Sequence, residues 1–105
     1  MLKVRVLGIP GCSHCEVLSE ELNRGQVDYT LLDANKNGAL ADKLEDFLGI
    51  EEYPIVIVES GSTSYYIYRG DTYESLNEVA SGAIVKKGCL SSYDMVNYII
   101  KLIKY

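Results

Sequence analysis

The sequence lacks the features that mark several large classes of protein. No apolar run approaches the roughly 20 residues that a membrane-spanning helix needs. Residues 1–7 alternate charged and apolar side chains without a secretory signal, so we expect a cytoplasmic protein that does not contact membranes. Lysine and arginine number 10 against 15 aspartates and glutamates, a net charge of −5, which argues against binding to nucleic-acid phosphates.

Repeats and low-complexity segments are also absent, and the remaining composition is that of an ordinary globular domain. The chain has 105 residues, of which 48% are hydrophobic and 24% are charged. Two cores of half this length would each be too small to stabilise themselves. We therefore expect residues 1–105 to form a single domain and the protein to be a monomer.

Cysteine is scarce, and its distribution is informative. Three cysteines are too few for a disulfide scaffold. Cys12 and Cys15 form a Cys-x-x-Cys motif near the amino terminus, which in a reducing compartment indicates redox or metal chemistry. Cys89 stands alone, and we expect a small buried hydrophobic residue there, with an extra modifiable thiol as the alternative.

The spacing of apolar residues predicts alternating strands and helices. Gly25 is expected to end the first helix in a left-handed conformation, and a capping box from Asp71 to Glu74 indicates the third helix. Residues 81–90 remain unassigned. The expected strands span 3–7, 27–32, 55–58 and 65–68, and the expected helices span 12–24, 40–48, 71–79 and 91–103.

This order of elements predicts an α/β fold. A right-handed strand–helix–strand connection makes the first two strands parallel, and the last two strands form an antiparallel hairpin. The run of β-branched residues at 55–58 is typical of a central strand buried on both faces. We therefore expect a mixed four-stranded sheet in the order β-α-β-α-β-β-α plus a C-terminal helix, with helices on both faces.

A Cys-x-x-Cys motif after the first strand, together with Tyr53-Pro54 before the third, resembles the thioredoxin fold. The short first unit looks most like glutaredoxins and glutaredoxin-like redoxins, over residues 3–74. The resemblance implies a dithiol–disulfide oxidoreductase that carries electrons and reduces protein disulfides or glutathione mixed disulfides. It implies glutathione as co-substrate, or a thioredoxin-type reductase as electron donor, and no bound cofactor. Disulfide-containing proteins, with ribonucleotide reductase as one candidate, would be the substrates.

The chemistry of the motif agrees with this resemblance. The thiolate is the nucleophile, and a free cysteine with a pKa of about 8.5 is mostly protonated at neutral pH. Cys12 at the helix start would meet unpaired N–H groups and the positive end of the helix dipole, which favour its thiolate. Cys12 would attack a substrate disulfide, Cys15 would resolve the mixed disulfide, and the two would end as a redox-active disulfide.

His14 is the only histidine, and it lies between the two cysteines. Its partial positive charge is expected to stabilise reduced Cys12 and to make the disulfide more oxidising. The alternative is a solvated residue without effect. Glu16 would act in the opposite direction, because a carboxylate disfavours a nearby thiolate.

The resemblance also assigns residues to substrate and glutathione binding. Pro54 matches the cis-proline of the family, and a cis bond would turn the Tyr53 backbone toward an extended substrate. Ser13, which lies inside the Cys-x-x-Cys motif, is assigned to the same binding site. Gly70 and Asp71 match the segment that holds the γ-glutamyl end, and residues 88–92 are a rival match.

Two departures from the family pattern weaken the case for glutathione. Glutaredoxins carry a basic residue shortly before the first cysteine, whereas residues 8–11 here are uncharged. Ser13 and His14 replace the aromatic residue often found between the cysteines. A redoxin reduced by a thioredoxin-type reductase is therefore the alternative within this class.

Two other classes remain as alternatives. A metal-binding module would use Cys12 and Cys15 with His14 or Cys89, but structural zinc needs four ligands and we expect no metal site. An iron–sulfur cluster shared between two chains is a variant of that hypothesis. A redox-inert adaptor is disfavoured by the intact Cys-x-x-Cys motif.

Overall fold

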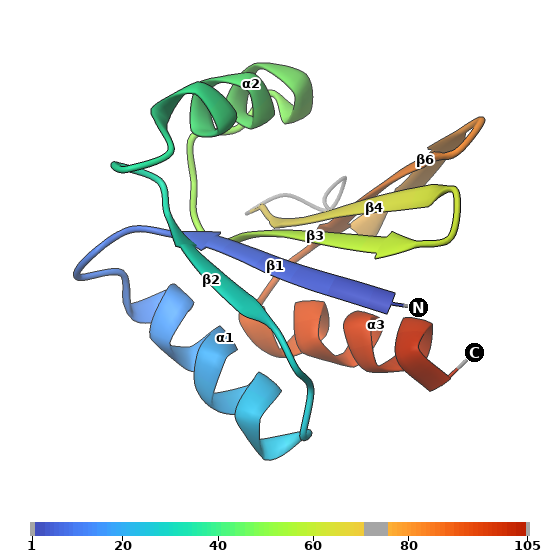
Figure 1. Cartoon of the computed structure of the whole chain (residues 1–105), viewed down its shortest axis with the longest axis horizontal. Coiled ribbons are helices and arrows are strands. Elements are labelled where there is room, and N and C mark those ends of the chain that lie inside the picture. The colour runs from blue at the N-terminus through green and yellow to red at the C-terminus, as the bar shows by residue number, and fades with distance from the viewer. Residues whose placement is uncertain (1, 71–75, 105) are drawn as a thin grey trace.

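Six strands form one mixed sheet with three helices within residues 2–70 and 76–104, the part of the chain that this computed structural model describes (Figure 1). The strand order is β2-β1-β3-β4-β6-β5. Pairing is parallel between β1 and β2 and between β4 and β6, and antiparallel elsewhere. In chain order the elements are β1 (Leu2–Gly8), α1 (Ser13–Arg24), β2 (Thr30–Asp33), α2 (Gly38–Leu48), β3 (Ile55–Ser60), β4 (Thr63–Arg69), β5 (Glu78–Ser81), β6 (Ile84–Cys89) and α3 (Ser92–Lys104).

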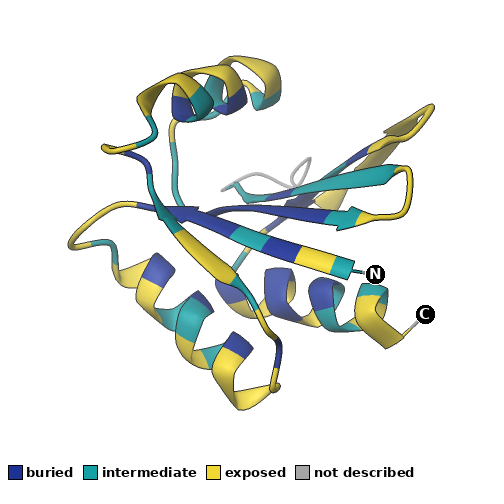
Figure 2. Cartoon of the chain, viewed as in Figure 1, coloured by how far each residue is buried: buried dark blue, intermediate teal, exposed yellow. Residues whose placement is uncertain are grey.

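The three helices divide the core between the two faces of the sheet. Helices α1 and α3 lie side by side below the sheet in Figure 1, and α2 lies above it. On β3, Val56 and Val58 point into the core under α1 and α3, whereas Ile55 and Ile57 point into the core under α2. The buried residues follow the inner sides of the helices and the central strands (Figure 2). The prediction of a central strand buried on both faces is therefore confirmed.

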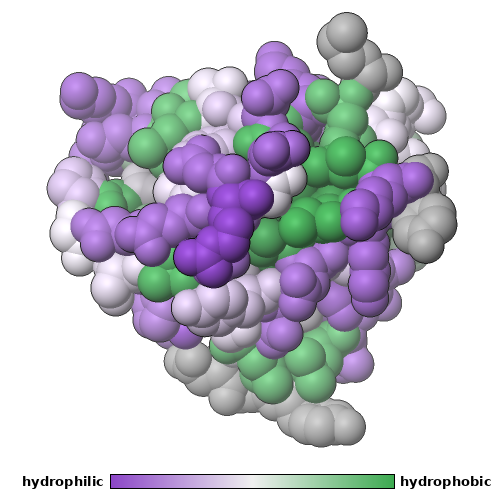
Figure 3. Space-filling view, turned by 90° about the horizontal axis from the view of Figure 1, so that it is seen from below, coloured by the Kyte–Doolittle hydropathy of each residue, from purple (hydrophilic) through white to green (hydrophobic). Residues whose placement is uncertain are grey.

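The outer surface of α1 and α3 is mixed in character. Seen from below, polar side chains cover much of this face and apolar patches lie between them (Figure 3). Among the described residues, no helix is both long enough and apolar enough to cross a membrane.

The sheet is larger than the four strands expected, because the chain forms a hairpin where we predicted a helix and an unassigned segment. Glu78–Ser81 is strand β5, so the prediction of a helix over 71–79 is wrong for its last residues. Residues 71–75, which include the proposed capping box, lie outside the described residues. Gly82 has φ +60, which suits the tight turn between β5 and β6. Backbone pairing with β6 therefore determines the structure of this segment, although the spacing of apolar residues up to Val79 is that of a helix.

Side chains attach this hairpin to the helices on both faces of the sheet. The Tyr98 hydroxyl of α3 donates a hydrogen bond to the Glu78 carboxylate. Lys86 Nζ donates to the Phe47 carbonyl of α2 at 3.2 Å and lies 4.0 Å from the centre of the Phe47 ring. The hairpin is therefore tied to the domain rather than projecting from it.

The turn after α1 corrects a second expectation. The helix ends at Gly25 as predicted, but Gly25 has φ −79, and the left-handed residue is Gln26 with φ 58. A Cβ atom at Gly25 would lie 3.2 Å from Cδ1 of Ile100 on α3. Glycine is favoured here because it permits close packing between α1 and α3, and not because of its backbone freedom.

Candidate active site around Cys12 and Cys15

Cys12 caps the amino end of α1 with its own side chain. Its backbone is extended, with φ −90 and ψ 106, and the Cys15 N–H donates a hydrogen bond to Cys12 Sγ at 3.1 Å. The two sulfurs form a disulfide, so the structure shows the oxidised form of the motif. Gly11 precedes the cap with φ +74, a conformation that glycine adopts without steric cost. The cysteine pair therefore lies where the first turn of a helix exposes backbone N–H groups.

The two cysteines differ in access to solvent. Cys12 is half-buried, and Cys15 is 7% exposed and faces the core. A Cβ atom at Gly8, the last residue of β1, would lie 3.3 Å from Cys15 Sγ. Gly8 is thus part of the site because it leaves room for the inner sulfur. Its only sequence signal was a glycine at the end of the strand that precedes the motif.

The loop before β3 reaches the outer sulfur. The Tyr53–Pro54 peptide bond is cis, as the sequence predicted, and Pro54 is buried. The Tyr53 carbonyl oxygen lies 3.7 Å from Cys12 Sγ, where a reduced thiol can donate a hydrogen bond to it. Burial, and next the charges of Glu45 and Asp42, raise the pKa of the Tyr53 hydroxyl. The hydroxyl consequently stays neutral at physiological pH.

The end of β4 contacts the loop that precedes β3 and the end of β6. The Gly70 N–H donates to the Cys89 carbonyl at 2.8 Å, so this donor is already engaged within the sheet. Arg69 forms an ion pair with Glu52 at 3.6 Å, directly before Tyr53 in the sequence. Asp71 lies outside the described residues.

The rival segment at residues 88–92 also approaches the motif. The Ser92 side chain is 3% exposed, and its hydroxyl donates to the His14 carbonyl at 3.0 Å. This bond joins the start of α3 to the first turn of α1, a contact that the sequence did not reveal. The side chains of Ser13 and His14 are themselves exposed. The backbone carbonyl of His14 is therefore part of the site, whereas its side chain faces solvent.

Cys89 lies in a different environment. It is a free thiol, 1% exposed, in the core under α1 and α3, so the prediction of a buried residue is confirmed. Burial raises the pKa of the Cys89 thiol to about 11, with a smaller lowering by Lys87 and a raising by Asp94. This thiol is protonated at neutral pH and shielded from reagents.

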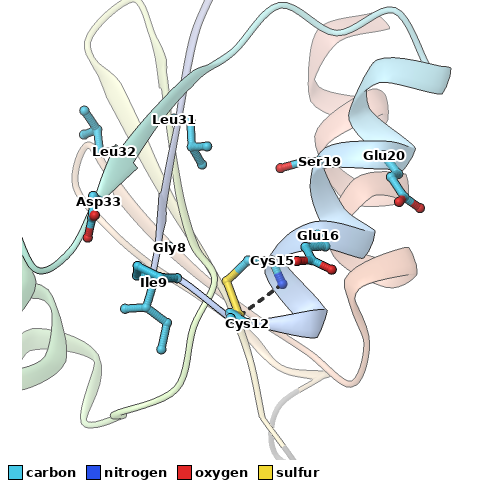
Figure 4. A pocket seen from close by; sticks show the side chains of 12 residues that line it. Gly8, Ile9, Cys12, Cys15, Glu16, Ser19, Glu20, Leu31, Leu32 and Asp33 are labelled. Carbon is cyan, nitrogen blue, oxygen red and sulfur yellow. Dashed lines mark hydrogen bonds between the residues drawn. A yellow bond between two sulfur atoms is a disulfide. The ribbon is translucent and has the colours of Figure 1, made fainter.

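A groove of about 530 Å³ lies beside the disulfide, between α1 and the edge strand β2 (Figure 4). Cys12 and Cys15 line one end of it. Leu31, which is 60% exposed, and Glu20 line its two sides. No sequence pattern links these segments, since Glu20 and Leu31 belong to different elements. Within the described residues, no group of three or more histidine, cysteine, aspartate or glutamate side chains is arranged to hold a metal ion.

Comparison with solved structures shows that this chain is similar in fold to thioredoxin-like proteins. The crystal structure of chloroplastic thioredoxin z superposes on 100% of this chain and 80% of its own, with a TM-score of 0.51 and 14% sequence identity. The chain has a thioredoxin-like fold. A mutant of a thioredoxin-like protein aligns with 56% of this chain and 85% of its own, at 27% identity and a TM-score of 0.47. No protein-family model matches the chain, and no curated protein matches it.

The predicted fold class is therefore confirmed, with a wider sheet than expected. In this thioredoxin-like fold the Cys-x-x-Cys pair occupies the start of the first helix, beside a cis-proline loop. The disulfide is accessible through its half-buried outer sulfur. Together, the fold and the cysteine pair indicate a thiol–disulfide oxidoreductase.

Proposed function

We propose that the protein is a glutaredoxin-like electron carrier that reduces disulfides in other proteins through Cys12 and Cys15. The observation that carries the proposal is the hydrogen bond from the Cys15 N–H to Cys12 Sγ at the start of α1. In the reduced protein the same N–H, with the helix dipole, stabilises a thiolate on Cys12. Cys12 is also the more exposed of the two sulfurs. It is therefore the proposed nucleophile.

The reaction proceeds in two exchanges. The Cys12 thiolate attacks one sulfur of the substrate disulfide, which forms a Cys12–substrate bond and releases the other substrate sulfur as a thiolate that takes a proton from water. Cys15 then loses its proton and attacks Cys12 Sγ. This step forms the Cys12–Cys15 disulfide and releases the second substrate thiolate, so two electrons pass to the substrate.

The loop at Tyr53 supplies a docking position for the substrate backbone. Its carbonyl lies 3.7 Å from Cys12 Sγ, and an extended substrate segment beside it can pair with the Tyr53 backbone as an added strand. Pro54, the next residue, has no N–H and is buried. We propose that Tyr53 and Pro54 orient the substrate sulfur toward Cys12.

Glutathione and a thioredoxin-type reductase are the two proposed electron donors. The structure supports the reductase more strongly, because the Gly70 N–H is engaged by Cys89 and residues 8–11 provide no cation for a glutathione carboxylate. A paired assay separates them: the oxidised protein is offered reduced glutathione in one reaction and NADPH with a thioredoxin reductase in the other. We expect faster reduction by the reductase, and a clear advantage for glutathione would reverse the assignment.

The proposed activity is tested with a small uncharged disulfide such as hydroxyethyl disulfide. The reduced protein should lose two thiols per chain, at Cys12 and Cys15, with Cys89 unchanged. Mass spectrometry after acid quench and alkylation identifies the oxidised residues. A reaction no faster than that of an equal concentration of free dithiol would refute the proposed function.

A further inference from the structure

The groove beside the disulfide is not occupied by any part of the described chain. One of its sides is the first half of α1, with Glu16 and Glu20, and the other is β2, with Leu31 and Asp33 (Figure 4). The disulfide closes one end. Anything that lies along the groove therefore runs directly to the reactive sulfurs.

The charges around the groove have one sign. Glu16, Glu20 and Asp33 contribute carboxylates, and among the described residues that line the groove none is cationic. The Asn35 N–H donates to Asp33 Oδ1 at 2.8 Å, which holds that carboxylate in place. A cationic ligand is favoured in such a groove, and a ligand with free carboxylates, such as glutathione, is repelled.

The groove also offers an apolar surface and an unpaired strand edge. Leu31 is 60% exposed. It pairs with Val6 of β1, whose side chain points into the core under α1, so Leu31 lies on the same face of the sheet as α1. Strand β2 is the last strand on its side of the sheet, so within the described residues its outer backbone edge has no strand partner. An extended peptide can pack its apolar side chains on Leu31 and form backbone hydrogen bonds with this edge.

We propose that the groove binds the part of the substrate protein that continues along the chain from the reactive cysteine held at Tyr53, and that this part is extended and carries lysine or arginine next to that cysteine. The inference rests on the proposed function, because it names the substrate class of the same dithiol. The basic side chains face Glu16 and Glu20, and the adjacent sulfur reaches Cys12 at the end of the groove. Electron transfer then follows the two exchanges described above.

The test uses two synthetic peptides with one intramolecular disulfide each, identical except that lysines flank the disulfide in one and glutamates in the other. Second-order rate constants are measured with the reduced full-length protein at low ionic strength and at about 0.5 M salt. We expect the lysine peptide to react at least about tenfold faster at low salt, and the ratio to shrink at high salt.

Two matched variants locate the effect. Glu20→Gln removes one carboxylate from the groove, and should lower the ratio of the two rate constants about two- to fivefold. Asp46→Asn removes one carboxylate from an exposed site on α2, across the sheet, and should leave the ratio unchanged. If both variants lower it equally, net charge rather than the groove sets the preference, and the inference is wrong.

The uncharged disulfide separates the two levels of the proposal. Reduction of hydroxyethyl disulfide without a preference between the peptides would overturn the groove assignment and leave the oxidoreductase function standing. Failure to reduce any of the three disulfides would overturn both.

Discussion

Cys12 at the start of α1 and Cys89 at the end of β6 place the same side chain in opposite environments. Cys12 is half-buried, and its sulfur accepts the Cys15 N–H at 3.1 Å. Cys89 is 1% exposed, and burial raises its pKa to about 11. Because the thiolate is the reactive form, a helix start favours reaction at the first position and a packed core prevents it at the second.

The difference arises from where each cysteine lies in its element. The first residues of a helix leave N–H groups without backbone partners, and a sulfur placed there becomes their acceptor. At the end of β6 the backbone groups are already paired, as the bond from Gly70 N–H to the Cys89 carbonyl shows. Thiol reactivity in this protein therefore depends on backbone N–H groups that remain available to donate to a sulfur.

The largest effect is expected from removing the thiols one at a time. Cys12→Ser should lower disulfide reduction by several orders of magnitude, because the nucleophile is lost. Cys15→Ser should accumulate a mixed disulfide on Cys12, since no thiol remains to resolve it. Cys89→Ala is the control and should retain the activity. Alkylation at neutral pH followed by mass spectrometry reports each thiol; loss of all labelling in Cys15→Ser alone would reverse the roles of the two cysteines.

The second prediction concerns stability at alkaline pH. The folded-state pKa of Cys89 is about 11, above the roughly 8.5 to 9.0 of a free thiol, so folding favours its neutral form. This contribution is fully present below about pH 9 and is lost as the pH rises toward 11, by about 2 to 3 kcal/mol. Between pH 8 and 11, the free energy of unfolding of the oxidised wild type should fall more steeply than that of Cys89→Ala.

The Cys89→Ala comparison removes the Cys89 thiol together with its charge effect on neighbouring groups. Burial and the hydrogen bond to Glu78, the larger causes, raise the pKa of Tyr98 in both proteins, and the Cys89 charge raises it further only in the wild type. Denaturant unfolding at each pH gives the two curves. Parallel curves would show that the Cys89 thiol is no harder to ionise in the folded protein than in the unfolded one.

How much could be predicted from the sequence depends on whether a segment carries a local signal. The motif at Cys12 and the strand at 55–58 carry strong local signals: glycine and proline before a cysteine pair, and an unbroken run of β-branched residues. Residues 78–81 carry no such signal. Val79 is 60% exposed, so the helix-like spacing of apolar residues that ends at Val79 does not mark a buried helix face. The segment becomes a strand only by pairing with β6.

The groove was missed for a related reason. Leu31 is 60% exposed, Glu20 is also exposed, and no periodicity marks either side chain as functional. They line one groove because the parallel pairing of β1 and β2 returns the chain beside α1. A site formed by tertiary packing between a helix and an edge strand leaves no short motif in the sequence.

A third prediction tests the contact between the two cysteine regions. Ser92 lies three residues after Cys89, and its hydroxyl donates to the His14 carbonyl at 3.0 Å. Ser92→Ala should lower the free energy of unfolding by about 1 kcal/mol and slow the alkylation of reduced Cys12, because the first turn of α1 loses a buried tether. Denaturant unfolding and the alkylation rate are the two measurements.

Ser91→Ala is the matched control for that variant. The Ser91 hydroxyl accepts the Asp94 N–H at 3.2 Å at the start of α3, so its loss should cost a similar amount of stability, about 1 kcal/mol. Ser91 makes no contact with the Cys-x-x-Cys turn among the hydrogen bonds of the described residues, and its removal should leave the Cys12 alkylation rate unchanged. Equal effects of both substitutions on that rate would show that the Ser92 bond only stabilises α3.

The smallest effect is expected at His14. Its side chain is exposed, so water and salt screen its charge, whereas the Cys15 N–H contacts the sulfur directly. Any stabilisation of the reduced, anionic Cys12 makes the disulfide easier to reduce, so His14→Ala should lower the reduction potential. With about 30 mV equivalent to 1.4 kcal/mol for two electrons, an exposed interaction predicts a decrease of roughly 5 to 20 mV. Equilibration of both proteins in one series of glutathione buffers measures the difference. A potential that stays the same or rises would assign the activation of Cys12 to the helix start alone.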